Sequence, residues 1–173
     1  IDERYVMVSI RNFDQIVIID LFSDEIVLTL GVDGQHDIMY EQHNPQYLLS
    51  SENLPTIIVA DSENDRIVEY EYSNNTWEQT WRLSGNLSWP RDADRLPNGN
   101  TLITDSLNHR VIEVTPLGKI VWEIRSPWGP YDAERLSLGD ESSDSTLLTS
   151  RDMGVLGSYQ LQDNHSEKDF KKP

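Results

Sequence analysis

Histidine carries the most versatile chemistry in this chain, because its 173 residues include four histidines and no cysteine. Without cysteine, disulfides, thiolate metal sites and thiol nucleophiles are all excluded. An imidazole nitrogen can act as a nucleophile or move a proton near neutral pH. His43 is the first candidate, and Arg91 stands at nearly the equivalent place one repeat further along. A guanidinium there could neutralise negative charge that develops on oxygen atoms.

Neighbouring residues extend this candidate site. Asn44 follows His43 and could donate a further hydrogen bond. His36, in the segment GVDGQHD, is the alternative candidate, because it could face the central channel of the fold predicted below, with His43 behind it. Three aromatic residues could stack on a ligand: Trp89, Trp128 and Tyr131. A structural role stays open for each candidate, since a histidine can simply line a channel and tryptophans often pack between sheets.

An internal repeat defines the elements that would position these residues. The segment VADSENDRIVEY at 59–70 recurs as ITDSLNHRVIEV at 103–114, a displacement of 44 residues. A weaker copy, SIRNFDQIVIID, occupies 9–20 and precedes the second copy by about 51 residues, so we expect an insertion between them. The period lies in the range of propeller blades.

Short β-branched runs surround each copy, and no helical period persists. The second copy predicts four strands, within QHNPQYLL, PTIIVADS, RIVEYEY and WEQTWRL. The third has RDADRL at 91–96, a PNGN turn, and TPLGKIVWEI at 115–124, and YDAERL at 131–136 begins a degenerate fourth unit. We therefore predict an all-β fold, a β-propeller of three to four four-stranded blades.

The innermost strands are predicted to begin at 42–44, 90–92 and 130–132, which would turn the candidate site toward the channel mouth. A closed propeller typically has about four to eight blades, so an arc of three or four would expose apolar faces. We therefore expect other blades or another chain to complete it. The predicted boundaries are 1–142 for the blades and 143–173 for a degenerate last blade and flexible polar tail.

Two carboxylate and guanidinium pairs recur at a spacing of five: Asp61 with Arg66, and Asp105 with Arg110. We predict a structural role for them, fixing the turn or bridging blades through bidentate geometry. The series Asp61, Glu63, Asp65 resembles a calcium loop only in part, because the glycine and the distant bidentate glutamate are missing. No metal site is predicted.

Charge excludes one large class of partners. With 30 acidic and 14 basic residues, the net charge of −16 repels nucleic acid. Solvation is the simpler explanation of this acidity, and divalent cation binding is the alternative. No apolar run approaches the roughly 20 residues that cross a bilayer, so membrane contact is expected only through segments outside this sequence. Acceptor triplets at Asn74, Asn86 and Asn164 favour an extracellular, cell-surface or periplasm-like location.

Two families share these motifs. DSENDRIVEY and DSLNHRVIEVTPLGKIVWEI resemble the NHL-type propeller repeat. The blocks HDIMYEQHNPQYL, WPRDADRLPNGNTLITDS and PYDAERLSLGDES resemble arylsulfotransferase-like propellers of prokaryotes, over roughly residues 5–142. That resemblance implies a six-bladed protein, often exported or membrane-anchored, that transfers sulfuryl groups between phenolic compounds through a histidine in the central channel. We expect no cofactor.

By this resemblance His43 would be the nucleophile, Arg91 would stabilise the sulfate oxygens, and the ligand would be a phenolic or sulfated small molecule. The family histidine could instead lie in a blade outside this sequence. The alternative function is a non-catalytic extracellular scaffold or binding module for a protein or glycan partner.

Overall fold

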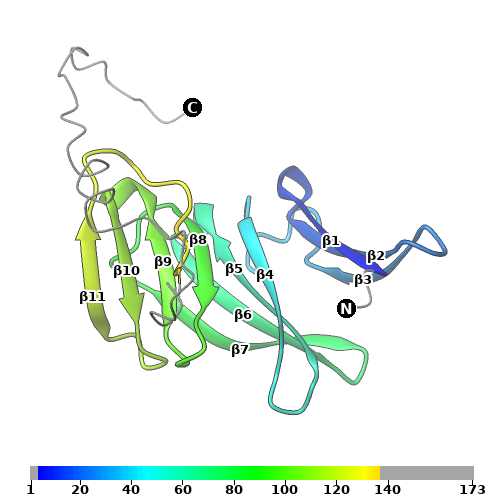
Figure 1. The fold of residues 1–173 in the computed structure, drawn as a ribbon. Helices are drawn as coiled ribbons and strands as arrows, with labels where there is room; N and C mark the ends of the chain where they lie inside the picture. The colour runs from blue at the N-terminus through cyan, green and yellow to red at the C-terminus, as the bar shows by residue number, and fades with distance from the viewer. Residues whose placement is uncertain (1–3, 137–173) are drawn as a thin grey trace, which may run out of the picture. The chain divides into compact units, whose positions relative to one another are not determined.

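The computed structural model describes residues 4–136, which form three antiparallel sheets (Figure 1). Blade 1 contains β1 (Tyr5–Ile10), β2 (Gln15–Asp20) and β3 (Glu25–Leu30). Blade 2 contains β4 (His43–Leu49), β5 (Pro55–Asp61), β6 (Arg66–Ser73) and β7 (Thr76–Ser84). Blade 3 contains β8 (Pro90–Arg95), β9 (Thr101–Asp105), β10 (Arg110–Val114) and β11 (Ile120–Arg125). Within each blade consecutive strands pair, which confirms the all-β prediction.

The structure tests two further features predicted from the sequence, the insertion and the start of a fourth blade. The expected insertion is the connection 31–42, which is 12 residues long where the matching connection 85–89 has five. The segment 131–136, predicted to start another blade, forms no strand. A strand needs hydrogen bonds from a neighbour, and this segment has no sheet partner within residues 4–136. The predicted last blade and tail at 143–173, with Asn164, lie outside the described residues.

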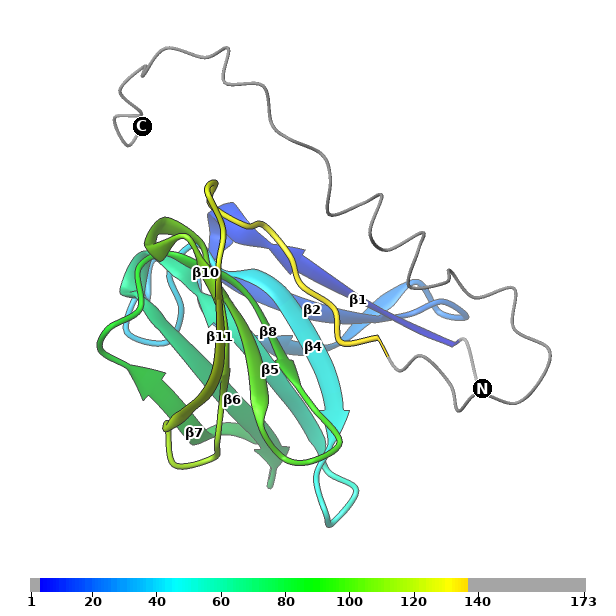
Figure 2. The ribbon, with the colours of Figure 1, turned by 60° about the vertical axis from the view of Figure 1, so that its left-hand side comes forward.

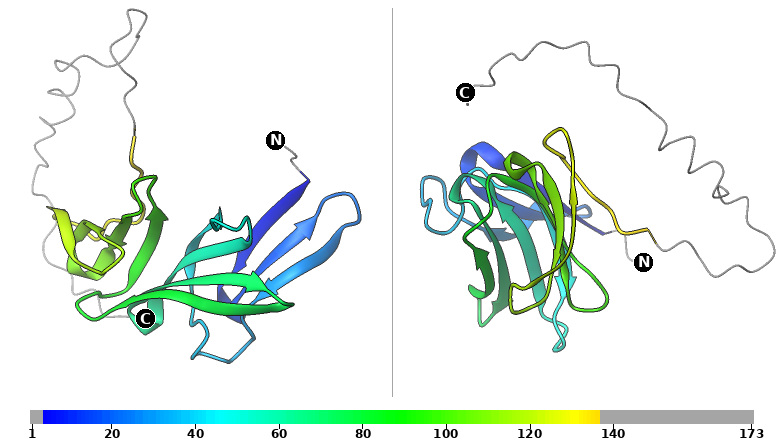
Figure 3. Two further views of the ribbon diagram at one scale, coloured as in Figure 1. Left: turned by 90° about the horizontal axis from the view of Figure 1, so that it is seen from below. Right: turned by 90° about the vertical axis from the view of Figure 1, so that its left-hand side faces the viewer.

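Blade 2 is buried on both faces because it lies between the other two (Figure 3). Along β5, Ile57 and Val59 join a core with residues of blade 1, whereas Ile58 and Ala60 join a core with residues of blade 3. Alternate side chains of a strand point to opposite faces, so a strand covered on both sides is apolar throughout. This burial explains the continuous apolar run in PTIIVA.

A short 3-10 turn links two strands in each blade: η1 (Arg11–Phe13), η2 (Ser62–Asn64) and η3 (Ser106–Asn108). Asp61 and Asp105 enter their turns with nearly the same backbone angles, φ −89° and ψ 79° against φ −91° and ψ 79°. Ile10 enters the first turn at φ −104° and ψ 77°. Equivalent local geometry at all three places shows that the sequence repeat is a structural repeat. No helix within residues 4–136 could span a membrane.

The carboxylate of Asp61 holds one turn against the loop that precedes β4. Its Oδ1 accepts the backbone N–H of Tyr40 at 2.7 Å. Its Oδ2 accepts Nε of Arg66 at 2.5 Å and Nδ2 of Asn64 at 2.9 Å. The same arginine donates to the carbonyls of Asp37 and Ile38 in that loop. The turn and the approach to the innermost strand are therefore fixed by one buried group.

Blade 3 repeats this network. Asp105 accepts the backbone N–H of Ser88 at 2.8 Å, Nε of Arg110 at 2.7 Å and Nδ2 of Asn108 at 2.9 Å. Arg110 and Asn108 both donate to the carbonyl of Asn86, just before β8. Each carboxylate thus bridges its own turn and the loop arriving from the preceding blade.

Replacing Asp105 with alanine should lower the free energy of unfolding by about 3–5 kcal/mol, because Ser88, Asn108 and Arg110 lose the buried acceptor that they share. Glu123→Ala is the matched control, since Glu123 contacts the same arginine at 3.4 Å from a more exposed place. We expect it to cost no more than about 1 kcal/mol. Urea denaturation followed by tryptophan fluorescence measures both. Equal losses would contradict the role given to Asp105.

Candidate functional site

His43 and Arg91 occupy equivalent positions at the starts of β4 and β8. His43 lies three residues after Tyr40, whose backbone N–H donates to Asp61. Arg91 likewise lies three residues after Ser88, whose backbone N–H donates to Asp105. The two strands lie side by side (Figure 2). At this end each strand pairs irregularly with its neighbour in its own blade. The register of β4 with β5 shifts between His43 and Gln46, and that of β8 with β9 shifts between Pro90 and Asp92. The irregular register brings consecutive side chains of each strand into different surroundings.

Ser62 determines which nitrogen of His43 carries the proton. Nδ1 of His43 lies 2.8 Å from the hydroxyl of Ser62. That hydroxyl donates to the carbonyl of Pro90 at 2.6 Å, and its only other acceptor is the carbonyl of Ala60 at 3.4 Å. A hydroxyl has one proton, so when Ser62 gives it to Pro90 it accepts from His43, and this arrangement favours the tautomer with the proton on Nδ1. In that tautomer the lone pair of the imidazole is on Nε2.

The surroundings of His43 keep its ring neutral. Burial lowers the pKa of the half-buried imidazole, and the positive charges of Arg11 and Arg91 lower it further. Trp89 and Tyr131 pack edge-on against the ring, with centroids 5.7 Å and 6.5 Å away. A neutral imidazole with a free nitrogen is the form that can act as a nucleophile or a base.

Arg91 is held between the same two aromatic rings. Its guanidinium carbon lies 4.0 Å from the ring centroid of Trp89 and 4.4 Å from that of Tyr131. Its Nε is buried without a hydrogen-bond partner, and Arg91 forms no ion pair within residues 4–136. Burial lowers the pKa of the guanidinium. A guanidinium that is partly shielded from water, with no carboxylate partner among the described residues, is suited to binding an anionic ligand.

We refer to His43, Arg91, Trp89 and Tyr131 as the histidine–arginine cluster. The indole of Trp89 is oriented by Nε1, which donates to the carboxylate of Glu63 at 2.9 Å. Four residues predicted from sequence thus come together from β4, from β8 and its approach, and from the segment after β11. Sequence reasoning missed Ser62, whose place in the repeated turn indicated only a structural role.

The other predicted site residues lie elsewhere. The ring of His36 stacks on Tyr40 at 3.9 Å, and its Nε2 is 3.4 Å from a carboxylate oxygen of Asp14. Trp128 is 60% exposed and has no ring contact with the cluster among the described residues. Asn44 lies next to His43 with φ +40°, and its side chain lines a separate groove.

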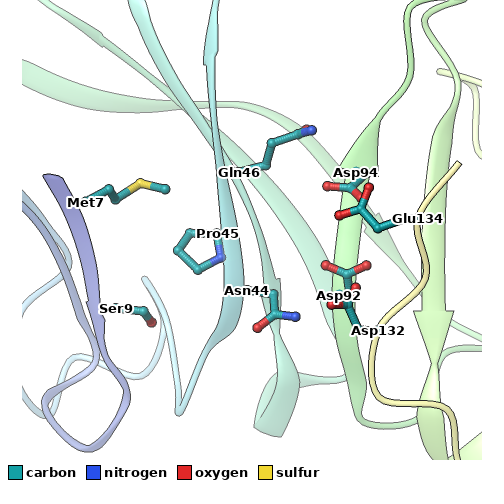
Figure 4. Close-up of a pocket in the computed structure, with 9 residues that line it drawn as sticks. All are labelled: Met7, Ser9, Asn44, Pro45, Gln46, Asp92, Asp94, Asp132 and Glu134. Atoms are coloured by element: carbon teal, nitrogen blue, oxygen red, sulfur yellow. The ribbon is translucent and has the colours of Figure 1, made fainter. Parts of the chain in front are cut away.

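This acidic groove encloses about 540 Å³ beside the cluster (Figure 4). Its walls are formed by Met7, Ser9, Asn44, Pro45, Gln46, Asp92, Asp94, Asp132 and Glu134. The four carboxylates come from the repeated blocks RDADRL and YDAERL, at matching positions 40 residues apart. Sequence reasoning used those blocks only to place strands, although the spacing of their acids was already visible.

Two of the carboxyl groups in the groove, those of Asp92 and Asp94, have raised pKa values. Burial raises the pKa of Asp92 to about 7, helped by the negative charges of Asp94 and Asp132. Burial also raises the pKa of Asp94, with Glu134 and Asp132 adding to the effect. Close acidic groups in a site of low polarity keep a proton that they would lose in water. Near pH 7 the carboxyl group of Asp92 is therefore partly protonated, and a bound cation could displace that proton.

Solved structures with the same fold confirm the predicted β-propeller. A periplasmic gluconolactonase from Pseudomonas aeruginosa matches 76% of this chain over 39% of its own, at 14% identity and TM-score 0.54. A virginiamycin B lyase from Staphylococcus aureus matches 76% over 41%, at 19% identity and TM-score 0.50. A streptogramin B lyase matches 76% over 40%, at 19% identity and TM-score 0.51.

At these identities the likeness establishes the fold alone. The chain spans about 40% of the length of the structures that it resembles. No protein-family model matches the sequence, and no curated protein does. The finer resemblance to arylsulfotransferase-like propellers stays a prediction.

Proton placement on His43 can be measured by long-range 1H–15N NMR. We expect Nδ1 to be protonated and Nε2 to carry the lone pair, with a pKa below the ordinary histidine value. Ser62→Ala should remove the acceptor and give a mixture of tautomers. Ser106→Ala, the corresponding change in blade 3, should leave the His43 signals unchanged. A Nε2-protonated ring in the unmutated protein would refute the assignment.

Asp92→Asn should stabilise the protein more at pH 8 than at pH 5. The folded-state pKa of Asp92, about 7, exceeds the ordinary aspartate value of about 4, so its unfavourable ionisation reduces stability as pH rises between them. After discounting for solvent screening, we expect a gain of roughly 1–2 kcal/mol at pH 8. Denaturation at both pH values measures it, with the exposed Asp33→Asn as control. A pH-independent gain would contradict the raised pKa.

Proposed function

We propose that the histidine–arginine cluster transfers sulfuryl groups between phenolic compounds, as the resemblance to arylsulfotransferase-like propellers suggests. One observation supports the proposal: a neutral His43 stands in a cluster with the guanidinium of Arg91, whose Nε is buried without a partner and which has no ion pair within residues 4–136. A nucleophile and an unpaired cation are the two groups that attack on a sulfate ester requires. The proposal concerns the complete propeller, to which this chain would contribute about three blades.

The first half-reaction would use His43 as the nucleophile. Its Nε2 lone pair forms a bond to the sulfur of an aryl sulfate, and the bond between sulfur and the phenolic oxygen breaks. The oxygen leaves with the bonding electrons and takes a proton from the solvent to give a phenol. In the second half, the hydroxyl of an acceptor phenol attacks sulfur and loses its proton, and the nitrogen–sulfur bond breaks to restore neutral His43.

Four residues would support this exchange. Arg91 would hold the sulfate oxygens, where negative charge rises during the transfer. Its position is set by Trp89 and Tyr131, which lie on either side of the guanidinium and limit its motion. Ser62 would act as a positioning residue, because its hydrogen bond keeps the reactive lone pair on Nε2.

Transfer from p-nitrophenyl sulfate to phenol tests the proposal in the purified protein. We expect His43→Ala to reduce the rate by about three orders of magnitude or more, because in this proposal His43 is the nucleophile. Arg91→Met should reduce it about 10²- to 10³-fold. His109→Asn is the control, since asparagine tolerates the left-handed backbone at φ +54° and position 109 lies outside the cluster. Release of p-nitrophenol is followed by absorbance.

Two results would reject the proposal. Unchanged transfer in His43→Ala would remove this histidine from the mechanism. Absence of transfer in the folded, unmutated protein, together with phenyl sulfate binding that depends on Arg91, would instead identify a non-catalytic binding module. That second outcome corresponds to the alternative function drawn from the sequence.

A further inference from the structure

The acidic groove differs in charge and in composition from the histidine–arginine cluster. Its carboxylates belong to Asp92, Asp94, Asp132 and Glu134. None of the four forms an ion pair with a basic side chain in the part of the chain that the structure describes. Four acids that share a pocket and lack cationic partners repel one another, so a bound cation would relieve the repulsion.

Asp92 supplies a second and independent sign of a ligand. The residue is only 4% exposed, and it lines the groove (Figure 4). Its Oδ2 is buried and has no hydrogen-bond donor among the described residues, apart from a proton that Asp92 and the neighbouring carboxyl of Asp132 can share. A buried acceptor without a donor is costly, and native structures normally satisfy such an atom. A ligand that donates hydrogen bonds would satisfy it.

The remaining walls indicate what kind of cation fits. Met7 and Pro45 present apolar surface on the side facing the carboxylates, and Ser9 and Asn44 add neutral polar groups (Figure 4). No three acidic or histidine side chains within residues 4–136 are placed to hold one metal ion. The groove encloses about 540 Å³, within the range of about 300–1,000 Å³ typical of small-molecule sites. An organic cation therefore matches the site better than a bare metal ion.

We propose that the acidic groove binds a primary amine, with its ammonium group at Asp92 and Asp132 and its carbon chain against Met7 and Pro45. An ammonium has three donors and no acceptor, so it satisfies Oδ2 of Asp92 and neutralises adjacent carboxylates together. Asp94 and Glu134, further along the groove, can hold a second ammonium of a diamine. The proposal uses no residue of the histidine–arginine cluster and does not depend on sulfuryl transfer.

Titratable groups around Asp92 determine how binding depends on pH. Asp94 faces it from β8, and Asp132 and Glu134 face it from segment 131–135, whereas β1 and β4 present only neutral side chains to the groove. The pKa of Asp92 is about 7, so lowering the pH from 8 to 6 protonates it. We expect binding to weaken about tenfold over that interval, since about one unit below a pKa leaves a tenth of a carboxyl ionised.

Putrescine is the probe, titrated into the purified protein at pH 8 by isothermal titration calorimetry. We expect saturable binding, and no binding of 1,4-butanediol, which has a similar length but no charge. Asp132→Asn and Glu134→Gln should each weaken binding about tenfold or more. Both changes nearly preserve side-chain shape, and blade 2 already has Asn44 and Gln46 at the matching places. Glu78→Gln, an equal change of charge at an exposed site in β7, should have no effect.

Three outcomes would overturn the proposal. The first is no putrescine binding to the protein while circular dichroism shows it folded. The second is equal binding in Asp132→Asn, Glu134→Gln and Glu78→Gln, which would mean that general negative charge attracts the probe. The third is saturation by Mg2+ or Ca2+ at lower concentration than putrescine, with loss in the same two variants, which would identify a metal site instead.

Discussion

The buried hydrogen bonds of Asp61 and Asp105 are the constraint on which the rest of this structure depends. Each carboxylate satisfies a backbone N–H in the loop from the preceding blade and, at the same time, an arginine and an asparagine of its own turn. An acidic group at 0% exposure is stable only when its acceptors are filled. The loop therefore has one favourable position, and the strand that follows starts at a fixed place.

Placement of those strand starts separates two sites of opposite character. His43 and Arg91 belong to a cluster in which the guanidinium has no ion pair within residues 4–136, whereas the next residues, Asn44 and Asp92, line the acidic groove. In a regular strand neighbouring side chains simply point to opposite faces of the sheet. Here the register shifts in β4 and β8, and the φ of +40° at Asn44, determine where these side chains point. Short irregular segments thus allow adjacent residues to serve different ligands.

Most of the fold could be predicted from the sequence because the repeat made each blade an independent check on the others. The equivalence of His43 and Arg91 followed from the same alignment. Two features could not be predicted, for physical reasons. His36 lies in the longer connection 31–42, away from the histidine–arginine cluster. The path of that connection depends on tertiary contacts such as the hydrogen bond from Nδ2 of Asn64 to the carbonyl of His36. The proton on His43 depends on Ser62, which meets it only after β4 and the turn come together.

Ser62 joins three parts of the chain through one oxygen atom: the imidazole of β4, the turn of blade 2 and the first carbonyl of β8. Its proton can point to Pro90 only when blade 3 has docked against blade 2. Before that step the hydroxyl is free to rotate, and it can donate to the ring instead of accepting from it. The preferred tautomer of His43 therefore depends on blade 3, and an isolated blade 2 would carry the imidazole without it.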